Sequence, residues 1–182
     1  MRLLPDRIDT PRLVLRAFRP EDVPCFVPLI GDWEVARWLA RVPYPYLEAD
    51  GQTWVALSNA MRADGSGLNL LAVRRDDGQP VGGVGLTVAT GEIGYWLGRP
   101  HQGAGYGTEM AGALVRAAFD AVGLDTVFAF TDPANDRSRR VLDKLGFAYG
   151  GLRAHDFALR GGLRPAHHYH LTAARWHNLN RG

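Results

Sequence analysis

The stretch that most constrains this chain is residues 101–109, His-Gln-Gly-Ala-Gly-Tyr-Gly-Thr-Glu, in which glycine recurs at every second position. Before it, residues 92–97 form a short run rich in aromatic and β-branched side chains, which predicts a strand. After it, residues 110–122 carry apolar side chains at helical spacing. The glycines therefore mark a strand-to-helix turn, where the backbone can approach a bulky group closely because no Cβ intervenes.

Successive amides in such a turn can point inward at the positive end of the following helix, which makes a site for phosphate oxygens. Two other interpretations stay open. The stretch can be no more than a flexible glycine-rich turn. A Rossmann fingerprint requires G-x-G-x-x-G in the first βαβ unit of a domain, with an acidic residue about 20 residues further on. Here the spacing is G-x-G-x-G and the motif lies past the middle of the chain, which disfavours that fold.

Read as Gln102-x-x-Gly105-x-Gly107, the turn resembles the Q/R-x-x-G-x-G/A acetyl-CoA loop of the GNAT N-acetyltransferases. Residues 92–97, residues 135–147 and the opening Thr-Pro-Arg-Leu-Val-Leu-Arg at 10–16 are similar to the RimJ/RimL-like branch of that family, which acetylates the N-termini of ribosomal proteins. The resemblance covers roughly residues 8–176. Four motifs in the right order are far more specific than the loop alone.

The hydrophobic pattern alone supports an α/β fold. The resemblance implies more: a mixed, mostly antiparallel central sheet with a splay between two central strands and helices on both faces. It also implies acetyl-CoA as co-substrate, no metal, and direct attack of a primary amine on the thioester in a ternary complex. The acceptor would be a protein N-terminus or a small-molecule amine. A different class stays open, namely a catalytically weak, acyl-CoA-binding GNAT-like sensor or partner module.

The resemblance assigns the cofactor to main-chain groups of the strand, to the loop amides, and to the first turn of a helix predicted at 135–145. These cofactor residues are Tyr95, Trp96, Leu97, Gln102, Gly103, Ala104, Gly105, Tyr106, Gly107, Thr108, Asn135, Ser138 and Arg139. Without the resemblance, Asn135 reads as a helix N-cap, Arg139 as a solvated helix arginine, and residues 95–97 as a core strand.

Many GNAT enzymes carry a tyrosine general acid seven residues after the asparagine, and that position is Leu142 here. The resemblance to the RimL-like branch makes Ser138 the candidate to protonate the leaving thiolate. Glu92 is the candidate base, acting through a water, because it begins the strand that leads to the acetyl group. The amide of Leu97 is expected to polarise the thioester carbonyl. Tyr149 is an alternative acid, and a surface role for Glu92 stays open. A dedicated base is dispensable, because an α-amino group with a pKa near 8 is partly neutral already.

Composition sets broader limits. With 182 residues, 46% hydrophobic and 22% charged, the sequence suits one soluble domain spanning 1–182. A net charge of +2 gives no argument for nucleic acid, and no apolar run approaches membrane-spanning length. The lone cysteine, Cys25, suits a reducing cytoplasm and is expected to be a small buried side chain. A monomer or a homodimer is expected.

The remaining elements follow from periodicity and turn signals. We predict strands at 8–17, 68–74, 80–88 and 125–131 and a hairpin of 152–160 with 166–172. Helices are predicted near 20–30, 32–39, 50–61 and 135–145.

The acceptor pocket is expected between the early helices and the last hairpin. Aromatic residues that could line it, or simply pack in the core, are Trp33, Trp38, Tyr44, Tyr46, Trp54, Phe157 and Tyr169. Acidic residues that could attract a cationic amine are Glu48, Asp50 and Asp156. The histidines His155, His167, His168 and His170 read as surface or acceptor-pocket residues, with a metal site as a minor option.

Overall fold

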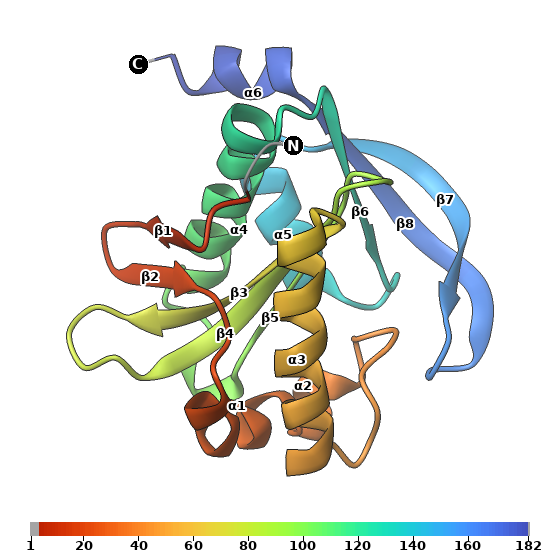
Figure 1. Ribbon diagram of the computed structural model, residues 1–182. Helices are drawn as coiled ribbons and strands as arrows, with labels where there is room; N and C mark the ends of the chain where they lie inside the picture. The colour runs from red at the N-terminus through yellow and green to blue at the C-terminus, as the bar shows by residue number, and fades with distance from the viewer. Residues whose placement is uncertain (1–3, 182) are drawn as a thin grey trace.

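The computed structural model describes residues 4–181, so the ends of the expected domain, residues 1–3 and 182, lie outside the described residues. Its centre is an eight-stranded sheet in the order β1-β2-β3-β4-β5-β6-β8-β7 (Figure 1). The neighbours β5 and β6 are parallel, and every other neighbouring pair is antiparallel. The predicted mixed, mostly antiparallel α/β sheet is therefore confirmed.

The strands are β1 Arg7–Asp9, β2 Leu13–Arg16, β3 Gly67–Arg74, β4 Pro80–Thr87, β5 Glu92–Leu97, β6 Thr126–Thr131, β7 Ala148–Phe157 and β8 Gly162–Thr172. The helices are α1 Val23–Ile30, α2 Trp33–Ala36, α3 Glu48–Asp64, α4 Tyr106–Ala117, α5 Asp136–Lys144 and α6 Ala173–Leu179. Short 3-10 turns lie at Pro20–Asp22 and Arg99–His101, and α4 continues into a π-helical turn at Ala118–Val122. Within residues 4–181, no helix has both the length and the apolar character needed to cross a membrane.

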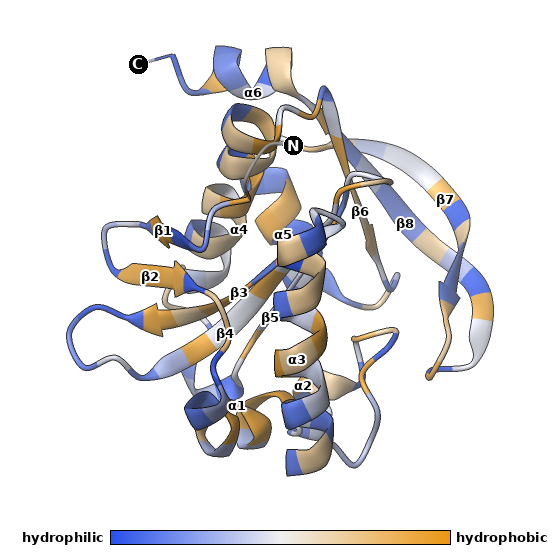
Figure 2. Cartoon of the chain, in the orientation of Figure 1, coloured by the Kyte–Doolittle hydropathy of each residue, from blue (hydrophilic) through white to orange (hydrophobic). Residues whose placement is uncertain are grey.

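Strand β3 shows how the sheet is covered on both faces. Its side chains alternate between two cores, as the pleat of a strand requires. Leu70 lies fully buried among residues of α4 and α5, and Leu71 lies fully buried among residues of α1 and α3. A strand buried on both sides reads as a continuous apolar run, and Figure 2 shows β2 and β3 as largely hydrophobic. Helices therefore cover both faces, as predicted.

The sheet opens between its two central strands. The β5–β6 ladder has one register pair, Glu92 with Phe128, next to a bond from the Phe128 N–H to the Gly91 carbonyl at 2.9 Å. Within residues 4–181, β5 and β6 have no further register pair, so toward Leu97 and Thr131 each keeps an unpaired edge. We call this opening the β5–β6 gap. It is the splay that the resemblance implies, now seen in the structure.

Two predictions about local structure were wrong, and one helix was not predicted. Residues 8–17 form two antiparallel strands rather than one, because Pro11 lies in a tight turn that is closed by a 2.9 Å bond from the Thr10 N–H to the Leu13 carbonyl. Helix α6 was missed. Cys25 is exposed, because the buried face of α1 runs through Val23, Phe26, Val27 and Ile30 at helical spacing and Cys25 lies off it.

Candidate functional site

The loop of residues 103–108, here called the anion loop, adopts a conformation that depends on its glycines. Gly103 and Gly105 have φ of 85° and 84°, in the left-handed region that favours glycine. Gly105 is the N-cap of α4, which has no side-chain cap, and its carbonyl accepts the first helical bond, from the Glu109 N–H at 3.1 Å. Within the described part of the chain, the amides of residues 103–108 donate no hydrogen bond. They form a row of free donors at the positive end of α4.

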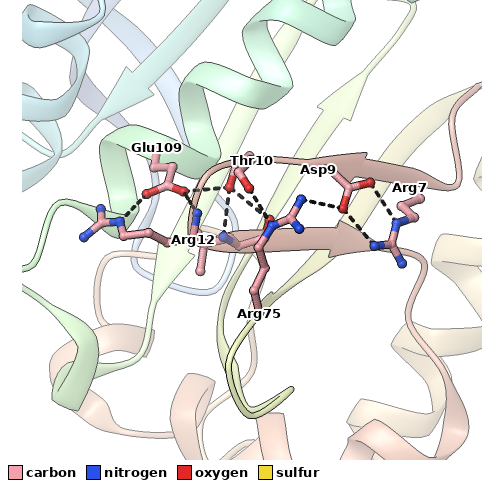
Figure 3. A network of polar contacts seen from close by, with 7 residues as sticks. Arg7, Asp9, Thr10, Arg12, Arg75 and Glu109 are labelled. Atoms are coloured by element: carbon pink, nitrogen blue, oxygen red, sulfur yellow. Dashed lines mark hydrogen bonds and ion pairs between the residues drawn. The ribbon is translucent and has the colours of Figure 1, made fainter.

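The first turn of α4 is held by the turn between β1 and β2 (Figure 3). Thr10 Oγ1 donates to Glu109 Oε1 at 2.7 Å, and the Arg12 N–H donates to the same oxygen at 2.8 Å. Arg12 Nε donates to Glu109 Oε2 at 2.7 Å. We call Thr10, Arg12 and Glu109 the clamp. Burial alone would raise the pKa of Glu109, but these hydrogen bonds together hold it below its ordinary value.

Arg12 also reaches the anion loop itself. Its Nη1 donates to the Ala104 carbonyl at 2.8 Å, and its guanidinium lies 4.6 Å from the centre of the Tyr106 ring. The clamp therefore fixes both the loop backbone and the helix that receives it. The Thr-Pro-Arg opening carries part of the resemblance, but the sequence alone assigns it no role, because contacts across 97 residues leave no local pattern.

Along the open edge of β5, the main-chain groups of every second residue point into the gap. The Gly91 carbonyl points toward β6, and the Gly98 N–H donates toward β4, to the Val81 carbonyl at 2.8 Å. Because main-chain groups alternate along a strand, those of Tyr95 and Leu97 point into the gap and those of Trp96 point toward β4. In agreement, the Leu97 carbonyl accepts from Gln102 Nε2 at 3.1 Å.

The side chain of Tyr95 leaves β5 toward α5. Its hydroxyl lies 2.9 Å from Ser138 Oγ and 3.1 Å from the Ser138 carbonyl oxygen. Burial of the phenol raises its pKa, so this hydroxyl stays protonated well above neutral pH. Glu92 and Trp96 alternate with Tyr95 along β5, so their side chains leave the strand on the opposite face.

The first turn of α5 brings together several predicted residues. Asn135 is its N-cap, and its Oδ1 accepts from the Ser138 N–H at 3.1 Å. Leu142 is fully buried in the core. The α5 arginine that contacts the anion-loop side is Arg137, whose Nη1 donates to Gln102 Oε1. Arg139 instead pairs with Asp136 at 3.1 Å.

On the other face of β5, Glu92 stands beside a row of aromatic and imidazole rings. His155 Nε2 lies 3.9 Å from Glu92 Oε1, and the His155 ring stacks on Phe130 with centroids 4.3 Å apart. His168 lies 5.6 Å from Phe128 and is buried, and this burial lowers its pKa. Within residues 4–181, the structure gathers no group of three or more histidine, cysteine, aspartate or glutamate side chains suited to a metal ion.

The tip of the β7–β8 hairpin packs against the segment that follows α2. The Leu159 N–H donates to the Ala40 carbonyl at 2.9 Å. Arg160 Nη2 donates to the carbonyls of Ala36 at 3.0 Å and Val42 at 2.8 Å. We call residues 36–42 together with 157–164 the acceptor wall. It lies between the early helices and the last hairpin, where an acceptor pocket stays a prediction.

The aromatic candidates for that pocket differ in how exposed they are. Trp33 and Tyr44 are about half exposed and lie 4.8 Å apart. Phe157 and Tyr169 are buried, and Trp54 packs edge-on against Phe18 with centroids 6.2 Å apart. Trp38 and Tyr46 are half-buried, so the Trp33–Tyr44 pair is the most exposed of the seven candidates.

Comparison with known proteins agrees with this geometry. A family model described as an acetyltransferase (GNAT) domain matches residues 12–148. Over 148 residues the chain is 26% identical to the uncharacterized N-acetyltransferase p20 of Bacillus licheniformis, covering 79% of this chain and 83% of that protein.

Solved structures share the fold. Mycobacterium smegmatis RimJ in complex with CoA-disulfide aligns with a TM-score of 0.78 at 22% identity, over 89% of this chain and 82% of that chain. The microcin C7 self-immunity acetyltransferase MccE in complex with acetyl-CoA and AMP gives 0.79 at 19% identity, over 93% and 98%.

Proposed function

This chain belongs to the GNAT acetyltransferase domain family, and we propose that it transfers an acetyl group from acetyl-CoA to a primary amine. The observation that carries the proposal is the anion loop, whose free amides lie at the mouth of the β5–β6 gap. The structures of RimJ with CoA-disulfide and of MccE with acetyl-CoA support this choice of donor. The acceptor is a protein N-terminus or a small-molecule amine.

The donor is held mainly by main-chain groups in this proposal. Amides of residues 103–108 bind the pyrophosphate at the positive end of α4. The pantetheine arm lies in the gap and pairs with main-chain groups of Tyr95 and Leu97, as an added strand would. Trp96 directs its main chain toward β4, so it has no main-chain contact in the proposal. Asn135 keeps its amide nitrogen available for the arm, because only its oxygen is used in the cap.

In this proposal the base and the leaving sulfur lie on opposite faces of β5. The amine approaches from the Glu92 face, where the carboxylate receives its proton through a water. The Leu97 amide points into the gap and stabilises the oxyanion on the thioester carbon. Ser138 lies on the opposite face, where the sulfur leaves. The amine proton is then removed on one side of the strand, and the departing sulfur is stabilised on the other.

A second candidate function rests on one observation. Leu142 occupies the position of the usual acid, and its aliphatic side chain, which is fully buried, has no proton to donate. A GNAT-like module that binds acyl-CoA without efficient turnover would show the same anion loop. Binding alone therefore does not decide between the two functions.

The deciding experiment combines two measurements on one sample. Acetyl-CoA is titrated into the protein by isothermal calorimetry, and thiol release is then followed with a mixed pool of amines and N-terminal peptides. Binding with release supports the acetyltransferase, and splitting the pool identifies the acceptor. Binding without release favours the binding module. No binding contradicts the anion-loop assignment on which both functions depend.

A further inference from the structure

The hydroxyls of Tyr95 and Ser138 form a pair that joins the two sides of the β5–β6 gap. Tyr95 belongs to β5, and Ser138 belongs to α5, the helix that follows β6. Their oxygens are 2.9 Å apart, a normal hydrogen-bond distance between hydroxyls. The pair lies on the face of β5 opposite Glu92, so it is separate from the candidate base.

Each hydroxyl carries one proton, which limits the pair to two arrangements. If Tyr95 donates to the Ser138 carbonyl at 3.1 Å, the 2.9 Å contact is a hydrogen bond only when Ser138 donates to the phenol oxygen, and its proton then points away from the gap. If Tyr95 donates to Ser138 Oγ, the Ser138 proton is free to point at a group in the gap. The second arrangement turns the serine into a directed donor. Because the phenol stays protonated, Tyr95 can keep this role across the neutral pH range.

The position of Ser138 suits a developing negative charge. It lies in the first turn of α5, where the helix dipole favours anions. It also lies one turn before Leu142, on the same helix face, so its hydroxyl stands near the place where the family's usual acid would sit. At the position of the usual tyrosine, α5 carries Leu142. The phenol next to this helix is instead that of Tyr95, which belongs to β5.

We propose that Tyr95 is a positioning residue that holds the Ser138 hydroxyl as the hydrogen-bond donor to the departing sulfur of CoA. The inference rests on the proposed acetyl transfer. When the tetrahedral intermediate collapses, the C–S bond breaks and its electron pair stays on sulfur, while the new C–N bond remains. The amine proton leaves toward Glu92. Ser138 donates a hydrogen bond to the thiolate and Tyr95 donates one to Ser138, so neither hydroxyl is consumed, and the thiolate takes its proton from water.

The test compares two acyl donors that differ in how much help their sulfur needs. Acetyl-CoA releases an alkyl thiolate, whereas S-acetyl-4-nitrothiophenol releases a thiolate that its nitro group already stabilises. We expect Tyr95→Phe and Ser138→Ala each to lower kcat with acetyl-CoA about tenfold. KM for acetyl-CoA should hold, and the double variant should be no slower than Ser138→Ala alone. With the aryl thioester the losses should nearly vanish.

A purely structural role for Tyr95 predicts other results and would overturn the proposal. The loss would then be equal for both donors, or the two substitutions would multiply in the double variant. Thr53→Val is the matched control, because it removes a hydroxyl that donates to the Ala49 carbonyl at 2.8 Å on α3, outside the proposed site. Its kcat should equal that of the wild type.

Two further measurements keep the test decisive. If Tyr95→Phe does not fold, 3-fluorotyrosine at position 95 changes the phenol acidity at nearly constant shape. A change in kcat confined to acetyl-CoA supports the proposal, and an equal change or no change with both donors contradicts it. If the wild-type protein binds acetyl-CoA but releases no thiol with any amine, the proposed function is contradicted instead. The wild-type assay is therefore done before any variant is made.

Discussion

The two sides of β5 are built in different ways. The donor side, which consists of the anion loop, the clamp and the gap edge of β5, offers mainly main-chain groups that short side-chain contacts hold in place. The proposed acceptor side consists of Glu92, the aromatic and imidazole rings beside it and the acceptor wall, and it offers side chains from segments that meet only in the folded chain. The matched family model ends at residue 148, so most of the β7–β8 hairpin lies outside it. The hairpin part of the proposed acceptor side therefore lies outside the range that the family model matches, whereas the anion loop, the clamp residues Arg12 and Glu109, and β5 lie inside it.

The largest expected effect breaks the donor side alone. In Gly105→Trp, a bulky side chain replaces a glycine at φ 84° whose Cβ direction meets Arg12 at 3.3 Å. We expect acetyl-CoA affinity to fall at least about 100-fold, or about 2.8 kcal/mol, by titration calorimetry. Gly65→Trp is the matched control, because Gly65 also has a positive φ, of 80°, with open space around it. Unchanged affinity in Gly105→Trp would contradict the anion-loop assignment.

A smaller effect is expected when the clamp is weakened and the loop sequence is kept. Glu109→Gln removes the charge that receives hydrogen bonds from Thr10 and Arg12, so the Kd for acetyl-CoA should rise about tenfold. Glu21→Gln, at an exposed carboxylate, is the control. Affinity equal to that of the wild type would mean that the loop holds its shape without the clamp.

The same carboxylate gives a pH dependence. Because the folded pKa of Glu109 is lowered, its contribution to stability is present above its ordinary pKa of about 4.3 and is lost as pH falls through the folded value. Unfolding curves from pH 7 to pH 3 should therefore show a difference between wild type and Glu109→Gln that shrinks below about pH 4.3.

A substitution on the opposite face of β5 tests whether the two sides are independent. Gly94 lies between Glu92 and Trp96, is exposed, and has open space where a Cβ would stand. Gly94→Val should fold normally, because a β-branched residue suits a strand. KM for the acceptor should rise roughly fivefold, with the Kd for acetyl-CoA unchanged. A loss of acetyl-CoA affinity would show that the two sides are coupled through the strand.

The smallest effect is expected at the acceptor wall. Arg160→Lys keeps the charge but loses the planar fork that reaches the carbonyls of Ala36 and Val42. We expect acceptor KM to rise about threefold with donor kinetics unchanged, because a looser hairpin positions the acceptor less well. Arg116→Lys, at an exposed position of α4, should leave both constants unchanged.

The same division explains what could be predicted from sequence. The strand, glycine turn and helix at 92–122 could be predicted, because the spacing of apolar residues and glycines within this segment determines its local structure. The clamp could not be inferred, since it joins residues 97 to 99 positions apart through side chains. Arg160 reaches carbonyls 118 and 124 positions away, again with no local signal. The hydroxyl of Tyr95 was overlooked because only the main chain of that strand was given a role.

The splay between β5 and β6 also affects how the stability of the fold depends on ligand concentration. A continuous sheet keeps its unpaired edges at its borders, but this sheet has two more in its interior. A ligand that pairs with them acts as a removable strand and binds the folded chain alone. By mass action, the folding equilibrium then rises and falls with the free concentration of that ligand. The lifetime of the protein in a cell would in this way be tied to the supply of its own substrate.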